Sequence, residues 1–259
     1  MPAAAGFAVE LSRADQVATF TLNRPAKRNA QNPLTWAWLT RTVNALPGTV
    51  RMLVVRGDGP SFSAGLDRAM FTPEGVDGIP GVQQLAQAGH EEASAEIAGY
   101  QQGLGVFARP GLVSLALVQG HAVGAGFQLS LACDVRIAAT DVQFSMAEVT
   151  LGLVPDLGGT KRLLELVGYS RAAEICLTGR RVGADEALRI GLVSSVAPPG
   201  ELAEAGERFV SAILERPVTA VTEIKALLLA AADRSQAEQE RAEREAQHRQ
   251  LRMLAGLSE

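Results

Sequence analysis

A glycine-rich turn between two apolar runs places the strongest constraint on how this 259-residue chain folds. Residues 112–118 form an apolar run that predicts a buried strand, and the apolar run 129–133 predicts a helix. Between them, in GHAVGAGFQL (residues 120–129), Gly124 and Gly126 let the backbone approach a ligand closely. A helix that begins here presents unpaired N–H groups and the positive end of its dipole, so the turn can hold a negative charge.

Short β-rich runs alternate with helical ones through the first 200 residues, which predicts the α/β class. Strands are expected at residues 17–22, 51–56, 112–118, 135–138 and 192–196. A helix is expected to follow Asn32 and Pro33, because asparagine caps helix N-termini and proline is favoured in the first turn. Residues 67–89 contain several glycines and prolines, and we expect a mobile loop there, beside the site.

From residue 201 onward, every segment is typical of helix. Residues 217–232 have apolar side chains at helical spacing, and Ser235 is placed to cap a charged helix over residues 236–254. A run of charges such as this one is usually a solvated face with pairs four residues apart; the alternative is the edge of an oligomer.

Composition and charge exclude several classes of protein. The net charge of −4 argues against nucleic-acid binding, and no apolar run approaches the ~18 residues that span a bilayer. We therefore expect a cytoplasmic protein without a membrane span, in which Cys133 and Cys176 are free thiols rather than a disulfide. The three histidines, His90, His121 and His248, are far apart in the sequence, and no cysteine or histidine cluster has metal-ligand spacing, so we expect no metal.

A second glycine turn, SFSAGLD (residues 61–67), also follows a buried strand. Two such turns could converge on one oxygen and form an oxyanion hole; alternatively, each glycine merely ends its strand. A dinucleotide-binding turn is the other reading of residues 124–126. It fits poorly, since Leu129 occupies the position of the third glycine that this motif needs.

Taken together, the motifs resemble the crotonase (enoyl-CoA hydratase/isomerase) superfamily over nearly the whole chain. The matching stretches are LNRPAKRNA (22–30), FSAGLD (62–67), residues 120–134, FSMAE (144–148), GLVPDLGGT (152–160), and LTGR (177–180) leading to GLV (191–193). The resemblance implies a spiral of ββα units in residues 1–200 that carries the acyl-CoA site. It also implies a helical region in residues 201–259 that drives formation of a homotrimer or hexamer.

The resemblance further implies that a coenzyme A thioester is the substrate and that no separate cofactor is needed. By position, the N–H groups of Ala64 and Ala125 would hold the thioester oxygen as it takes on enolate charge. The residues that the resemblance places around coenzyme A are Lys27, Arg28, Ala30, Ser63, Ala64, Leu66, Asp67 and Lys225. For Lys27 and Arg28 a solvated surface pair is the alternative, and for Lys225 a plain surface lysine.

Catalysis in this family depends on carboxylates, and here the chain departs from the hydratase pattern. Typical hydratases use two glutamates, one to activate water and one to deliver a proton. One of the two positions matches Glu148, but the other matches Gln128, whose amide cannot exchange protons near neutral pH. Glu148 could instead be a solvent-exposed loop acid, and Gln128 an ordinary polar residue at a helix start.

A single main carboxylate suits the movement of a double bond, in which one proton is removed and one is returned. Family members that shift double bonds often carry an acid at the position of Asp156, eight residues after Glu148. The alternative role for Asp156 is to cap the following helix. Met70, Phe71 and Met146 flank the motifs and are candidates for the acyl pocket or for plain core.

Three functions follow from these residues. The first is isomerisation of an enoyl-CoA through an oxyanion-stabilised enolate, with Glu148 as the main proton carrier. The second is hydration of a 2-enoyl-CoA, with Gln128 orienting water for Glu148. The third is binding of acyl-CoA without catalysis.

Overall fold

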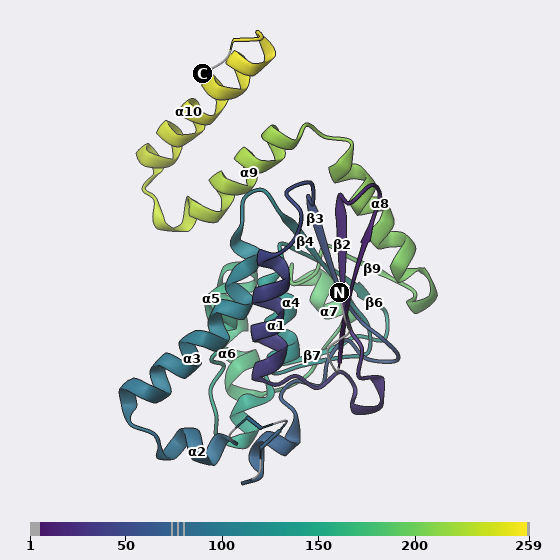
Figure 1. The fold of residues 1–259 in the computed structure, drawn as a ribbon, viewed down its shortest axis with the longest axis vertical. Coiled ribbons are helices and arrows are strands. Elements are labelled where there is room, and N and C mark those ends of the chain that lie inside the picture. The colour runs from purple at the N-terminus through teal and green to yellow at the C-terminus, as the bar shows by residue number, and fades with distance from the viewer. Residues whose placement is uncertain (1–5, 74, 77, 80, 258–259) are drawn as a thin grey trace.

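The computed structural model describes residues 6–73, 75–76, 78–79 and 81–257, and it shows helices on both faces of a mostly parallel sheet (Figure 1). The sheet has the strand order β1-β2-β3-β4-β6-β9. Strands β1 and β2 form an antiparallel hairpin, and the remaining neighbours are parallel. The strands are β1 Phe7–Ser12, β2 Val17–Leu22, β3 Met52–Gly57, β4 Val113–Val118, β6 Val135–Ala139 and β9 Ser195–Ala197.

The central strands are apolar throughout because both of their faces are covered. In β4, Val113, Leu115 and Leu117 belong to a core cluster with the buried residues of helix α8 (Leu202–Leu214). Ala116 and Val118 belong to a larger cluster on the opposite face, together with residues of α1, α4 and α5. Alternate side chains of one strand therefore serve two separate cores.

A smaller sheet lies at the glycine turn that precedes α4. It contains β5 His121–Val123, β7 Gln143–Ser145 and β8 Val182–Gly183, in that order. Because β5 leads directly into α4 (Ala125–Ala132) and β7 leads into the 3-10 helix η4 (Ala147–Leu151), this sheet brings the starts of both helices together.

The other long helices are α1 Pro33–Asn44, α3 His90–Gly105, α5 Gly159–Val167 and α6 Tyr169–Thr178, with the shorter α2 Val82–Gln87 and α7 Ala184–Arg189. As expected, α1 begins with Asn32 as its cap and Pro33 in its first turn, and Thr35 completes a capping box. Helices α1 and α3 cross closely, since a side chain at Gly103 would lie within 3 Å of Trp36.

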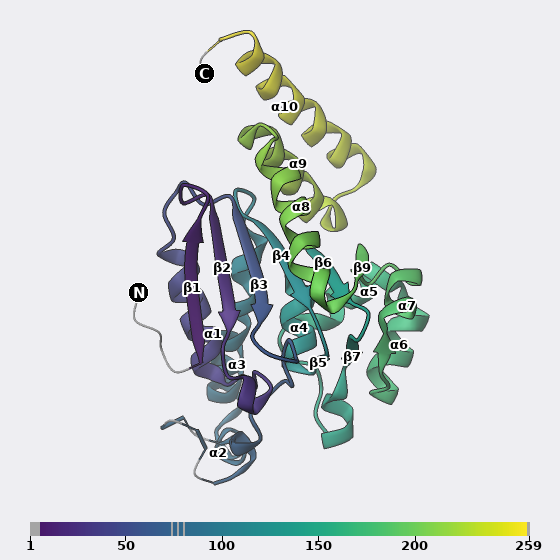
Figure 2. The ribbon, with the colours of Figure 1, turned by 90° about the vertical axis from the view of Figure 1, so that its right-hand side faces the viewer.

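The C-terminal part is helical, and it extends away from the sheet (Figure 2). Helix α8 packs on the sheet, whereas α9 (Val218–Ala230) and α10 (Gln236–Leu254) project beyond it. The predicted Ser235 cap is confirmed, and Glu238 completes a capping box. Within the described ranges, no helix is both long and apolar enough to cross a membrane.

Two sequence-based expectations are wrong. The last strand occupies Ser195–Ala197 rather than residues 192–196, because Leu192 and Val193 end the turn after α7 and are buried in the core. Residues 67–89 are not simply a loop, since they contain the 3-10 helix η2 (Arg68–Phe71) and α2. Residues 74, 77 and 80 of this stretch lie outside the described part of the chain.

Candidate active site

The two glycine turns lie side by side, in agreement with the first of the two readings of their sequence. Ser63 donates its backbone N–H to His121 O at 2.8 Å and accepts from Val123 N at 3.0 Å. Gly65 lies against the start of α4, because a Cβ at this position would be 2.5 Å from Val123 O and 3.5 Å from Ala125 N. The close approach explains why this turn requires glycine.

Backbone hydrogen bonds determine which N–H groups of the two turns remain free to bind a ligand. The N–H of Ala64 donates to Arg28 O at 2.8 Å, so the prediction that Ala64 is an oxyanion donor is wrong. Gln31 bridges the residues on either side of Leu66, since Gln31 N donates to Gly65 O and Asp67 N donates to Gln31 O, both at 2.7 Å. In such a parallel bridge the N–H of the middle residue points to the opposite side.

The candidate donor pair is therefore Leu66 and Ala125. Ala125 is the first residue of α4, and its N–H has no partner within the helix. Among the described residues, neither Leu66 N–H nor Ala125 N–H donates to a protein acceptor. Two free N–H groups from adjoining turns, one of them at a helix N-terminus, suit an oxygen that acquires negative charge.

Gln128 and Glu148 are in direct contact beside these donors. Gln128 is 1% exposed, and its Nε2 donates to Glu148 Oε1 at 2.7 Å. Its Oε1 accepts from Leu157 N at 2.9 Å and Gly159 N at 3.2 Å, which fixes the orientation of the amide. These bonds hold the Gln128 side chain in place and prevent its amide group from rotating.

Glu148 lies at the N-terminus of α4, because a Cβ at Gly124 would be 3.4 Å from Glu148 Oε1. Its other oxygen, Oε2, is buried and has no hydrogen-bond partner among the described residues. Burial raises the pKa of Glu148, hydrogen bonds from its own backbone and from Gln128 offset part of this effect, and the negative charge of Asp156 raises it further. A buried carboxylate with a free oxygen and a raised pKa is suited to proton transfer, so the reading as a solvated loop acid is wrong.

Asp156 does not cap a helix, contrary to one of the two roles considered for it. The N-cap of α5 is Gly158, and it makes no side-chain capping bond. Although the residue as a whole is exposed, surrounding protein atoms reduce hydration of the carboxyl group and raise its pKa. Its negative charge contributes to the raised pKa of Glu148.

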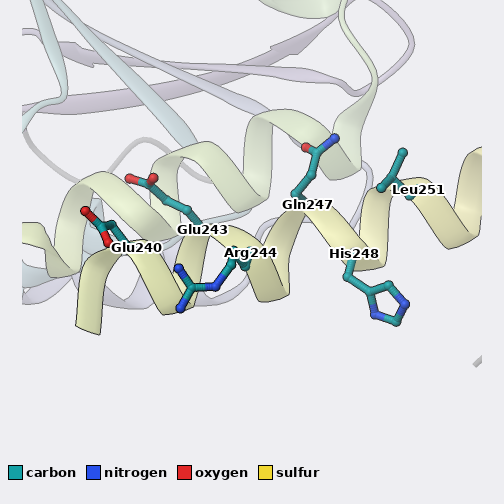
Figure 3. A pocket seen from close by; sticks show the side chains of 6 residues that line it. All are labelled: Glu240, Glu243, Arg244, Gln247, His248 and Leu251. Carbon is teal, nitrogen blue, oxygen red and sulfur yellow. The ribbon is translucent and has the colours of Figure 1, made fainter. Parts of the chain in front are cut away.

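A cavity of about 320 Å³ lies between α3, α4 and α5, and Gln128 and Leu157 form part of its wall. A second hollow, of about 450 Å³, is formed by one face of α10 (Figure 3). It is lined by Glu240, Glu243, Arg244, Gln247, His248 and Leu251 and shares no residue with the carboxylates or the free N–H groups. Within the described residues, no cluster of three or more histidine, cysteine or acidic side chains is arranged to hold a metal ion.

Known proteins share this arrangement of elements. The family model described as enoyl-CoA hydratase/isomerase matches residues 12–253. The chain belongs to that family. A short-chain-enoyl-CoA hydratase of Clostridium acetobutylicum is 33% identical over 82% of this chain and 77% of its own length. The human mitochondrial Delta(3,5)-Delta(2,4)-dienoyl-CoA isomerase is 34% identical over 84% of this chain and 66% of its own length.

Among solved structures, a protein of Thermobifida fusca YX assigned as an enoyl-CoA hydratase and crystallised with CoA superposes with a TM-score of 0.90. It is 43% identical, and the match covers 97% of this chain and 95% of that chain. The predicted crotonase-like α/β fold is thus confirmed. Relatives include both hydratases and an isomerase, so membership of the family leaves the reaction open.

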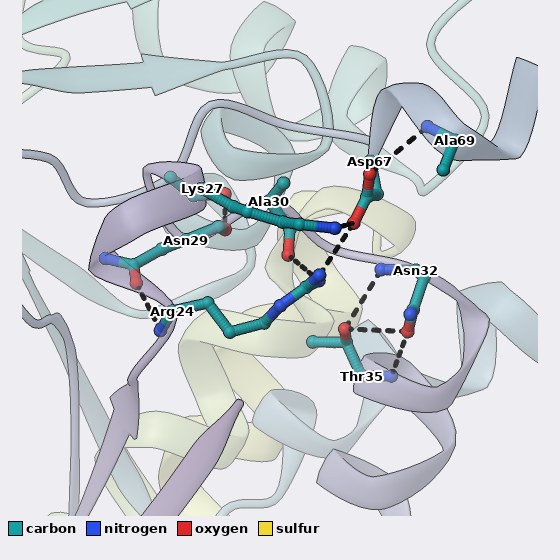
Figure 4. A network of polar contacts seen from close by, with 9 residues as sticks. Arg24, Lys27, Asn29, Ala30, Asn32, Thr35, Asp67 and Ala69 are labelled. Atoms are coloured by element: carbon teal, nitrogen blue, oxygen red, sulfur yellow. Dashed lines mark hydrogen bonds and ion pairs between the residues drawn. The ribbon is translucent and has the colours of Figure 1, made fainter. Parts of the chain in front are cut away.

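A cluster of charges surrounds the stretch that the family resemblance assigns to coenzyme A (Figure 4). Asp67 is buried, accepts from Arg24 Nη2 at 2.8 Å and lies 3.6 Å from Lys27 Nζ. Burial acts to raise the pKa of Asp67, but hydrogen bonds from Ala69 and Arg24 and the charges of Arg24 and Lys27 outweigh it, and the pKa falls below its usual value. Arg24, which also donates to Ala30 O at 3.0 Å, was not identified from the sequence.

The remaining predicted coenzyme A residues fall into two groups. Lys27 and Arg28 are exposed, and Ala30, Ala64 and Leu66 are half-buried, so all five stay candidates. Ser63 is fully buried, and its hydroxyl bonds Asn29 O, Gln31 Nε2 and Gly65 N. Its side chain therefore supports the turn rather than the ligand.

Lys225 is neither a surface lysine nor free for a ligand. It is buried in α9, and its Nζ donates to Phe107 O, Leu112 O and Asp134 Oδ2 at 2.5 to 2.7 Å. Because an ammonium has three donors, all of them are used within this chain, and Lys225 fastens α9 to the body. Burial lowers the pKa of Lys225, and Asp134 opposes this effect.

The predicted acyl-pocket residues also differ from one another. Met146 is fully buried within the large core cluster, which favours its structural reading. Met70 is buried and Phe71 half-buried in η2, outside both core clusters. These two residues stay candidates for the acyl pocket.

Proposed function

We propose that this protein moves a double bond in an enoyl-CoA thioester, from C3 to C2. The observation that carries the proposal is the buried, unpartnered Oε2 of Glu148, beside a Gln128 that occupies the place of a second hydratase glutamate. The two free N–H groups support a thioester as the substrate. The relative crystallised with CoA supports coenzyme A as the group that carries the acyl chain.

In the proposed reaction, the thioester oxygen accepts from Leu66 N–H and Ala125 N–H. Glu148 removes a proton from C2 of a 3-enoyl thioester, and the negative charge spreads from C4 to the oxygen. Loss of one such donor typically costs about 2.7–4 kcal/mol of transition-state stabilisation. A proton delivered from Asp156 to C4 completes the 2-enoyl product, so one proton leaves and one returns.

We propose that the two acids take opposite roles. Burial raises the pKa of both, and the negative charge of Asp156 raises the pKa of Glu148 further, which favours a state in which one of the two carries a proton. That state provides a base and an acid at the same time. Proton exchange with water then restores the pair after each turnover.

Gln128 argues against ordinary hydration. Its Nε2 faces Glu148 and its Oε1 is held by two backbone N–H groups, so it offers no exchangeable acid proton. Hydration with Gln128 as a water-orienting group is the second candidate, and the hydratase relatives favour it. Binding without catalysis has less support, because the Oε2 atom of Glu148 is buried without a hydrogen-bond partner and Gln128, not an arginine, bonds its Oε1 in the described structure.

Relative rates test the proposal. We expect isomerisation of trans-3-hexenoyl-CoA to be at least as fast as hydration of trans-2-hexenoyl-CoA. Fast hydration without isomerisation would instead establish the hydratase function. Tight acyl-CoA binding without turnover of either substrate would establish the binder.

We further propose that the protein acts in the cytoplasm as a homotrimer or hexamer and needs no resident cofactor. The projecting helices α9 and α10 carry exposed apolar side chains, among them Ile224 at 57%, Leu228 at 71% and Leu254 at 86%. Such faces are typical of contacts between subunits. Light scattering during gel filtration would give a mass three or six times that of the chain, whereas a monomer would refute the assembly.

A further inference from the structure

Two glutamine side chains hold the segment that carries Asp156 from opposite sides. Gln128, on α4, accepts from the N–H groups of Leu157 and Gly159. Gln101, on α3, donates its Nε2 to the carbonyl oxygen of Asp156 at 2.8 Å. Both glutamines line the cavity of about 320 Å³, together with Leu157, Gly158 and Gly159 of this segment.

The segment contains two successive glycines, and no side-chain cap holds it at the start of α5. Gly158 has φ +83°, a conformation that few other residues adopt, and it begins α5 without a side-chain cap. Gly159 lies so close to Gln128 that a Cβ there would be 2.7 Å from Gln128 Cγ. Neither a helix cap nor an ion pair fixes Asp156 within the described structure.

Helix α3, which carries Gln101, is packed closely against α1. Tyr100, the preceding residue, packs its ring on Trp36 of α1, with 5.1 Å between the ring centroids. Gly103, two residues later, allows α1 to approach α3 closely. The contact from Gln101 therefore ties the Asp156 segment to the α1–α3 pair.

We propose that Gln101 is a positioning residue, which fixes Asp156 relative to Glu148 through the Asp156 carbonyl. This inference rests on the proposed isomerase function. Without the contact, the Asp156 segment moves toward water, and the carboxyl group is less well placed to return a proton to the substrate. Binding of the thioester, which depends on Leu66 and Ala125, is unaffected.

The test compares Gln101→Met, which keeps the size but removes the donor, with Gln101→Glu, which is isosteric and also cannot donate. Gln102→Met is the matched control, because Gln102 is the adjacent, exposed residue of the same type. Since the bond of Gln101 is exposed to solvent, we expect kcat for isomerisation to fall roughly 2- to 5-fold in both Gln101 variants. KM should stay within about 2-fold of the wild type, and the control should be unchanged.

A second readout separates positioning from a loss of fold. Better hydration of Asp156 lowers its apparent pKa, so the alkaline limb of the isomerisation profile should move to lower pH in Gln101→Met. Equal kcat, KM and pH profiles in Gln101→Met and Gln102→Met would overturn the inference. A lower kcat with an unmoved profile and a lower melting temperature would overturn it too, because it would show a purely structural role.

If the proposed isomerase function is wrong, a separate experiment still tests the positioning role of Gln101. If the wild type does not isomerise any enoyl-CoA, the inference is tested by NMR titration of the ¹³C-labelled Asp156 carboxyl group. A lower pKa in Gln101→Met than in Gln102→Met supports positioning even then. Identical titrations would overturn it.

Discussion

Replacing Gln128 with glutamate would place two carboxyl groups in contact at the centre of the site. Gln128 Nε2 now lies 2.7 Å from Glu148 Oε1, and the change alters no atom positions beyond the amide itself. The new carboxyl group can still accept from Leu157 N and Gly159 N, so we expect the variant to fold. Two unit charges 4 Å apart repel by about 4 kcal/mol at an effective dielectric constant of 20.

A repulsion of that size corresponds to roughly three pKa units, because one unit is about 1.4 kcal/mol. The pair in Gln128→Glu should therefore keep one proton at neutral pH and provide the acid and base that hydration needs. General acid–base catalysis contributes about 10²–10⁴-fold, so hydration of crotonyl-CoA should rise by at least about 10-fold relative to isomerisation.

Stopped assays of both reactions measure the ratio of the hydration rate to the isomerisation rate. The melting temperature of the variant checks that it is folded. A folded Gln128→Glu variant with an unchanged ratio would refute the reasoning, because it would show that the amide at this position does not decide the reaction.

Three further predictions follow from the same contacts. Glu148→Gln should lower turnover by roughly 10²–10⁴-fold while a thermal-shift assay still detects acyl-CoA binding; near-normal turnover would transfer the role to another group. Isomerisation should rise as the pH passes the raised pKa of Glu148 and fall above the raised pKa of Asp156, and Asp156→Asn should abolish the second limb of a steady-state pH profile. Lys225→Met should lower the unfolding free energy by about 3–5 kcal/mol, since it leaves the half-buried Asp134 carboxylate without its cation; urea unfolding within 1 kcal/mol of the wild type would contradict this value.

The strands and helix starts could be predicted where a local signal decides them. Continuous apolar runs identified β3 and β4 because both faces of these strands are buried. The caps Asn32 and Ser235 were predictable because their side chains bond backbone groups only three residues away. The short strands β5, β7 and β8 have no such signal, since each depends on pairing with a distant partner.

The residue types of the site could be predicted from the sequence, but the directions in which its backbone N–H groups and side chains point could not. Convergence of the two glycine turns was one of two readings of the sequence, and the free N–H group belongs to Leu66 rather than Ala64. That difference depends on the register between Gln31 and Leu66, which residue spacing does not encode. The burial of Lys225 likewise depends on two carbonyl groups more than 100 positions away, so its residue type alone could not reveal it.

The central claim is that Glu148 and Asp156 move a proton along an enoyl thioester. One measurement tests it most directly: a single turnover of trans-3-hexenoyl-CoA by the enzyme in D₂O, with products identified by NMR. We predict 2-hexenoyl-CoA as the first product, with one deuterium at C4 delivered from the exchanged Asp156 carboxyl group. Unchanged substrate, together with rapid conversion of crotonyl-CoA to its 3-hydroxyacyl product, would contradict the account.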